Sequence, residues 1–174
     1  MNFERLTGIV ITKESPNYEE CCLAWNRAIN KHPLVIVYCQ NNDDIINAIK
    51  SDKKVYVMVA PATEGQFGED ITMASWEKAM LELGFDGFYD VSLGADMTAA
   101  YESLEWTEAH HEGRKMTTSC CPAFINMQRQ HFPKVFQENV SSIVSPMCAI
   151  SRYLKKTRPG CITVFLGPCI AKKS

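Results

Sequence analysis

The sequence lacks any long apolar run and any excess of charge of one sign. Its first twenty residues, MNFERLTGIVITKESPNYEE, acquire charge and proline before an apolar stretch reaches signal-peptide length. No later run approaches the roughly 18 apolar residues that a membrane span needs. The net charge of −2 and the isoelectric point near 6.1 give no basic surface for nucleic acid. We therefore expect a cytoplasmic protein with neither a membrane nor a nucleic-acid partner.

The sequence also lacks closely spaced cysteine pairs of the type C-x-x-C or C-x-x-x-C, although it holds eight cysteines. This absence excludes a self-contained zinc knuckle and a ferredoxin-type ligand run. Eight cysteines are nevertheless many for a reducing compartment, where grouped thiols more often bind metal or do redox chemistry than form disulfides. Any metal cluster must therefore take its ligands from loops that lie far apart in the sequence.

What the sequence does hold, from Lys53 onward, is an alternation of short β-rich runs with helical periods. This alternation predicts an α/β fold, with an open, mostly parallel sheet and flanking helices. In such sheets, ligands gather at the carboxyl ends of the strands. Three unusual stretches are each expected to end a strand there: Ala60-Pro61-Ala62, Cys120-Cys121-Pro122 and Pro168-Cys169.

The first fifty residues predict a small α/β segment of their own. We expect a helix from about Tyr18 to Asn30, then a strand at LVIVYC, then a helix opened by Asn41, Asn42 and Asp43. The polar stretch Lys50–Lys54 is the candidate junction, which divides the chain into residues 1–52 and 53–174.

The cysteines fall into two groups by their surroundings. A free cysteine is usually a small buried hydrophobic residue, and we interpret five of them in this way: Cys21, Cys22, Cys39, Cys148 and Cys161. Cys120, Cys121 and Cys169 lie instead beside prolines at expected strand ends, where the turn is stiff and the backbone exposed. Thiolates on such loops favour iron–sulfur ligation.

Three ordered motifs carry a family resemblance: TTSCCPAF at 117–124, SPM at 145–147 and GPCIAKK at 167–173. Together with VAPATEGQFGEDIT and GFDGFYDVSLGADMTAAYESLE, they resemble the catalytic domain of iron-only (FeFe) hydrogenases over residues 53–174. The resemblance implies an H-cluster, which is a 4Fe-4S cluster joined by a cysteine thiolate to a two-iron subsite where hydrogen is made or split. An electron carrier such as ferredoxin and maturation proteins are the partners that it implies.

The resemblance also assigns roles to residues of this sequence. Cys121 and Cys169 match cluster ligands, whereas Cys120 matches the thiol that passes protons to the two-iron subsite. Glu102, Glu105 and Ser141 match the proton path; without the resemblance, the two glutamates read as an ordinary solvated helix face. Lys172 matches the lysine that hydrogen-bonds a cyanide ligand. Pro61 and Pro146 match walls of the two-iron pocket, which Ala60, Ala62 and Met147 are also expected to line.

The sequence departs from the family pattern at several points. Gly167 stands where well-known members have methionine, and Phe124 stands where tryptophan is common. The family's late C-x-x-x-C motif, which supplies the other two ligands and the bridging thiolate, is expected beyond Ser174, and ferredoxin-like cysteine runs are absent. We therefore expect one incomplete lobe that gives no hydrogen turnover alone, and that either associates with itself or is completed by a partner chain.

Residues 1–50 have a different resemblance. PNYEECCLAWNRAI and PLVIVYCQNNDDIINAI resemble the start of FAD-linked oxidases of the berberine-bridge type. The glycine-rich flavin loop of that family does not follow, so we assign no flavin-binding residue and expect no bound FAD. The simplest account is a hybrid or truncated reading frame. The alternatives are a non-catalytic iron–sulfur or sensing module completed by a partner, or a fragment of an FAD-linked oxidoreductase.

Overall fold

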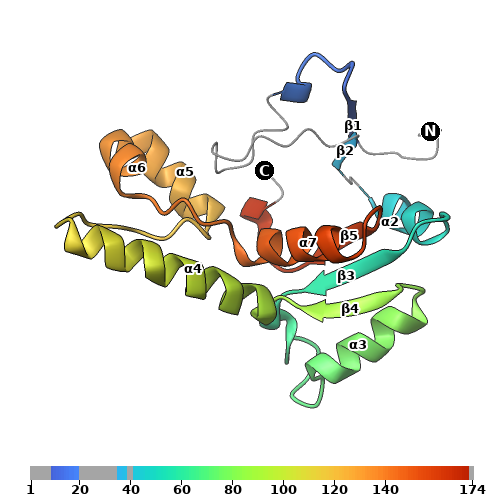
Figure 1. The fold of residues 1–174 in the computed structure, drawn as a ribbon. Coiled ribbons are helices and arrows are strands. Elements are labelled where there is room, and N and C mark those ends of the chain that lie inside the picture. Colours follow the sequence, from blue (N-terminus) through green and yellow to red (C-terminus); the bar gives the residue numbers. More distant parts are fainter. Residues whose placement is uncertain (1–8, 20–34, 39–40, 173–174) are drawn as a thin grey trace.

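The computed structural model describes residues 9–19, 35–38 and 41–172. Its centre is a parallel sheet of three strands, β3 (Val55–Val59), β4 (Gly87–Asp90) and β5 (Ile162–Leu166), in the order β4-β3-β5 (Figure 1). Val57 lies opposite Phe88 of β4 and Val164 of β5. The predicted open parallel sheet with flanking helices is therefore confirmed.

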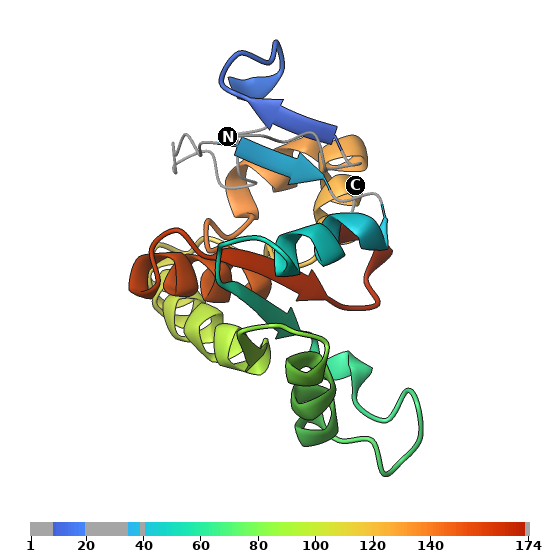
Figure 2. The same cartoon turned by 90° about the vertical axis from the view of Figure 1, so that its right-hand side faces the viewer.

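The alternation of side chains along β3 divides the core into two parts. Val55, Val57 and Val59 are buried on one face with Met80 and Phe85, whereas Met58 is buried with Ile150 and Leu154. The first face is covered by α2 (Asn42–Ile49) and α3 (Met73–Glu82). The other is covered by α7 (Pro146–Thr157), against which α4 (Ser92–His111) packs (Figure 2).

Helices α4 and α7 approach closely at Gly94. A Cβ atom at this position would lie 2.2 Å from the carbonyl oxygen of Pro146, the first residue of α7. The hydroxyl of Thr98 donates to the carbonyl of Val144 at 3.1 Å. The absence of a side chain at Gly94 therefore lets α4 hold the start of α7 in place.

Beyond α4, the chain forms α5 (Pro122–His131) and α6 (Pro133–Asn139), which pack against each other beside the outer part of α4 (Figure 1). Helix α6 was not predicted. The expectation that a strand ends at Cys120 and Cys121 was wrong, since only one isolated bridge, Thr117 to Val140, precedes them. The run that precedes the cysteines is short of apolar residues, and the Thr118 and Ser119 hydroxyls bond backbone groups in place of a strand ladder.

The amino-terminal part forms a separate antiparallel pair, β1 (Ile9–Thr12) with β2 (Val35–Tyr38). Strand β2 and helix α2 confirm the expected LVIVYC strand and the helix start, and the Asn41 side chain accepts from the Asp43 N–H at 2.9 Å. Strand β1 was not predicted. Apart from Tyr18 and Glu19, the helix expected near residues 18–30 lies outside the described residues. Within the described part of the chain, no helix is long and apolar enough to cross a membrane.

Helix α2 belongs by sequence to the first segment but packs on the core of the second. Ile45, Ala48 and Ile49 contact the cluster that contains Val55 and Val57. Residues on both sides of position 52 therefore contribute to one core. The division of the chain at that position stays a prediction.

Candidate functional site

Two of the three stretches expected at the carboxyl edge of the sheet do meet there. The Ala60 N–H donates to the Leu166 carbonyl at 2.9 Å, which extends the β3–β5 pairing by one residue. A Cβ atom at Gly167 would lie 3.1 Å from that of Ala60. The short helix η1 (Pro61–Thr63) follows, with Pro61 and Ala62 exposed. Ala60, directly after β3, therefore lies beside Leu166 and Gly167, shortly before Cys169.

Cys169 lies just beyond β5 and is a partly exposed free thiol. It is followed by the short helix η2 (Ile170–Lys172), in which the Lys172 N–H donates to the Cys169 carbonyl at 3.3 Å. Ile170 is 83% exposed. This turn brings the backbone of Lys172 back to that of Cys169.

Cys120 and Cys121 are also partly exposed free thiols, on the loop that leads into α5. Cys121 has an extended backbone, Pro122 begins the helix, and the Cys121 carbonyl accepts from the Ile125 N–H at 3.0 Å. Helix α5 packs against η2. The helix that starts after Cys121 therefore contacts the turn that starts after Cys169.

These thiols suit iron as members of a larger ligand set. Partly exposed cysteines on neighbouring loops are the donors that iron–sulfur clusters use. Among the described residues, no group of three or more histidine, cysteine or acidic side chains could hold a metal ion. Cys121 and Cys169 are donors of the type that such clusters use, and two thiols are fewer than the four ligands that a 4Fe-4S cluster takes.

Glu105 lies at the centre of a hydrogen-bonded group between α4 and the segment before α7. The Ser141 hydroxyl donates to its Oε2 at 2.6 Å, and the Ser142 N–H donates to its Oε1 at 3.0 Å. Burial raises the pKa of Glu105, but these hydrogen bonds and the nearby Arg114 outweigh it and hold the pKa below its usual value. Glu105 is therefore an ionised acceptor, with Ser141 buried beside it.

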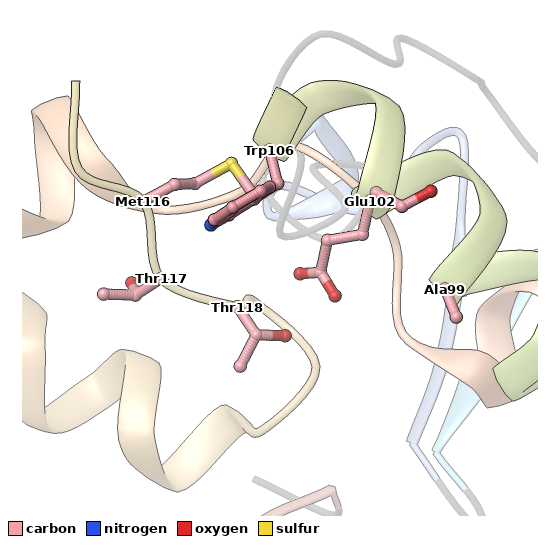
Figure 3. A pocket seen from close by; sticks show the side chains of 7 residues that line it. Ala99, Glu102, Trp106, Met116, Thr117 and Thr118 are labelled. Atoms are coloured by element: carbon pink, nitrogen blue, oxygen red, sulfur yellow. The ribbon is translucent and has the colours of Figure 1, made fainter. Parts of the chain in front are cut away.

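Glu102 lies one turn earlier on α4 and extends into a pocket of about 410 Å³ (Figure 3). The pocket is lined by Ala99, Glu102, Ser103, Trp106, Met116, Thr117 and Thr118. The Oε1 atom of Glu102 is buried and has no hydrogen-bond partner within the described part of the chain. The expectation that Glu102 and Glu105 share a helix face is confirmed. Both are half-buried, Glu102 beside Thr117 and Thr118 and Glu105 beside Ser141.

Thr118 joins this pocket to the adjacent cysteines. Its side chain lines the pocket opposite Glu102 (Figure 3). Its Oγ1 accepts from the Cys120 N–H at 3.4 Å. Our sequence reasoning missed Thr118. The signal was present in the TTS triplet before the cysteines, because hydroxyl residues in loops commonly bond nearby backbone groups.

The remaining predicted site residues, Pro146 and Met147, lie in the first turn of α7. Pro146 begins α7 against Gly94, and Met147 packs partly buried against the cluster of Met58 and Ile150. Cys148 and Cys161 are partly exposed, which corrects the expectation that they are buried, although Cys161 does pack against that same cluster. Cys21, Cys22 and Cys39 lie outside the described residues.

Comparison with known proteins agrees with this arrangement. Residues 53–174 match the family model described as iron only hydrogenase large subunit, C-terminal domain. The chain belongs to this family. It is 30% identical over 150 residues to iron hydrogenase 1 of Clostridium pasteurianum, and 28% identical over 154 residues to the NADP-reducing hydrogenase subunit HndD of Solidesulfovibrio fructosivorans. Each match covers 75% of this chain and 26% of the relative, so the chain spans about a quarter of the length of these two relatives.

A second kind of relative matches a shorter part of the chain. Two FAD-linked oxidoreductases of Bacillus subtilis, YgaK and YvdP, are 38% and 46% identical to it over 50 residues. Each of these matches covers 29% of this chain and 11% of the relative. This agrees with the second resemblance, and it leaves the hydrogenase family as the one that spans most of the chain.

Proposed function

We propose that residues 53–172 form the part of an iron-only hydrogenase site that supplies two cluster thiolates and a proton path. The observation that carries the proposal is the contact between α5 and η2, which begin directly after Cys121 and Cys169. Membership of the hydrogenase family supports the same assignment.

Cys121 and Cys169 would hold the 4Fe-4S cluster, together with thiolates from outside these residues. When bound, the H-cluster supplies the electrons and the iron subsite at which protons and hydrogen interconvert. The Lys172 ammonium, on the turn after Cys169, is a cationic donor for an anionic ligand of that subsite. Ala60, Pro61 and Ala62, which follow β3, would supply a small, rigid wall of the pocket that holds the two-iron subsite.

The proton path starts at Cys120, whose sulfur both donates and accepts a proton. Thr118, whose Oγ1 accepts from the backbone N–H of Cys120, and Glu102 come next, at the pocket between α4 and the cysteine loop. Ser141 and the ionised Glu105 follow, joined by the 2.6 Å hydrogen bond. The Oε1 atom of Glu102 is buried without a partner at this pocket, so it is an acceptor that a donor group entering the pocket can satisfy. Electron-transfer partners are proposed because one relative is named as a subunit of an NADP-reducing hydrogenase.

The test divides the roles of the two adjacent thiols. The purified chain is reconstituted anaerobically with iron and sulfide, and iron and labile sulfide are counted in the Cys120→Ser and Cys121→Ser variants. We expect Cys121→Ser to lose bound iron and Cys120→Ser to keep it, because only Cys121 is assigned as a ligand. Equal losses in the two variants would contradict the proposal.

A further inference from the structure

Gln128 is a buried amide whose presence in α5 is not explained by stability. Its side chain is 3% exposed, and its Nε2 donates to Oγ1 of Thr117 at 3.2 Å. Its Oε1 is buried and has no partner among the described residues. Burying an unpaired amide oxygen is unfavourable, whereas an apolar side chain of the same length at this position would bury no unpaired polar atom. The one bond that Gln128 makes is therefore what needs an explanation.

The Gln128 bond is made to Thr117, whose backbone N–H and carbonyl are also both hydrogen-bonded. The Thr117 N–H donates to the Asn139 carbonyl at 2.7 Å, and the Thr117 carbonyl accepts from the Ser141 N–H at 2.8 Å. Thr117 lies four residues before Cys121, and Gln128 lies in the second turn of the helix that follows it. The Gln128 amide therefore ties α5 back to the chain before the cysteines and closes a loop around them.

The cysteine loop has few other bonds to hold it. Residues 118–121 belong to no strand, and the Cys120 N–H reaches Thr118 only at 3.4 Å. The Ser119 hydroxyl donates to the Ile143 carbonyl, and Pro122 restricts the backbone on the other side. A single additional bond to Thr117 thus has a large effect on where this segment lies.

We propose that Gln128 is a positioning residue, which fixes residues 117–121 and thereby the separate directions of the Cys120 and Cys121 thiols. Cys121 has an extended backbone, with φ −105° and ψ 107°, and successive side chains of extended chain point to opposite sides. That separation is useful only while the segment stays in place. The roles of the two thiols rest on the proposed function, but their positioning by Gln128 does not.

The experiment measures how fast each thiol reacts in the metal-free, reduced chain. Alkylation by iodoacetamide is followed by peptide mass spectrometry in Gln128→Met and in Gln130→Met, a matched change at an exposed position of the same helix. We expect Gln128→Met to speed the alkylation of Cys120 and Cys121 by about fivefold, because the loop opens locally. Cys148 and Cys161, on other elements, keep their rates, and Gln130→Met changes none of the four.

Unchanged rates at Cys120 and Cys121, or equal increases at all four cysteines, would overturn the inference. The Thr117→Val variant removes the same bond from its other end, so it tests the inference even if Gln128→Met folds poorly. The double variant is expected to react no faster than the faster single variant, whereas multiplying effects would show that the two residues act independently. Iron counting after reconstitution separates the two proposals, because a chain that binds no iron can still show the alkylation pattern.

Discussion

The Ser141 hydroxyl donates to Oε2 of Glu105 at 2.6 Å and so joins two residues that lie 36 positions apart. Ser141 Oγ also accepts from the Ile143 N–H at 3.1 Å, so its hydrogen is directed at the carboxylate. Glu105 thus holds the segment before α7 against α4 while remaining an ionised end of the proposed proton path. The two functions can be tested separately.

The Glu105→Gln variant tests the structural function. A neutral amide is a weaker acceptor for Ser141 and Ser142, so we expect the free energy of unfolding to fall by about 1–3 kcal/mol. Glu108→Gln, an exposed position on the same helix, is the control and should change it by less than about 0.5 kcal/mol. Urea unfolding followed by circular dichroism measures both. Equal effects of the two substitutions would show that the Glu105 hydrogen bonds do not stabilise this contact.

The pH dependence of the same variant has a predicted sign. The pKa of Glu105 is lower in the folded chain than its ordinary value of 4.5. Its stabilising contribution is therefore complete above about pH 4.5 and is lost as the pH falls through the folded pKa. The stability difference between the wild type and Glu105→Gln should stay constant from pH 7 to about pH 4.5 and shrink as the pH falls further. A difference that grows on acidification would contradict the assigned ionised state.

Gly94→Ala tests the close approach of α4 to α7. The new methyl group would lie 2.2 Å from the Pro146 carbonyl oxygen, so the helices must separate. We expect a destabilisation of about 1–3 kcal/mol, although alanine is the better helix former. Ala95→Ser adds a single atom at the neighbouring exposed position and should have little effect. A Gly94→Ala chain as stable as the wild type would mean that this contact is looser than described.

Ile45→Ala tests whether α2 is part of the main core. Ile45 packs against the cluster of Val55 and Val57, whereas Ile46, the next residue, is 43% exposed. Thermal unfolding should show a loss of about 1–3 kcal/mol for Ile45→Ala and less than about 0.5 kcal/mol for Ile46→Ala. A loss that appears only as a separate early transition would show instead that α2 belongs to an independent amino-terminal unit.

Local patterns in the sequence were sufficient for the sheet and its main helices. The apolar run around Val57 predicts β3, because a strand buried on both faces is apolar along its whole length. The stretch 94–111 predicts α4, because it is long and holds neither proline nor a second glycine that would interrupt a helix. Helix α6 was missed because Phe132-Pro133 reads as an end, although proline also begins helices. The packing of Ile45 on the sheet could not be predicted, since it depends on tertiary contacts.

The residues of the candidate site also fall into a group that the sequence identified and a group that it did not. Motifs identified Cys120, Cys121 and Cys169, and helical spacing placed Glu102 and Glu105 on one face. The parts missed, Thr118 and Gln128, act through hydrogen bonds to groups that only the folded chain brings close. The predicted strand before Cys120 was wrong for the same reason, because the Ser119 hydroxyl bonds to Ile143, a residue far along the chain.

The central claim is that Cys121 and Cys169 bind one cluster together. Its most direct test is anaerobic iron–sulfur reconstitution of the chain, with iron counting and electron paramagnetic resonance of the reduced sample. Cys121→Ala and Cys169→Ala are compared with Cys148→Ala and Cys161→Ala, which change partly exposed cysteines that are not assigned as ligands. We predict a cluster signal that either of the first two variants abolishes and neither control affects. Equal iron and the same spectrum in all four variants would contradict the account.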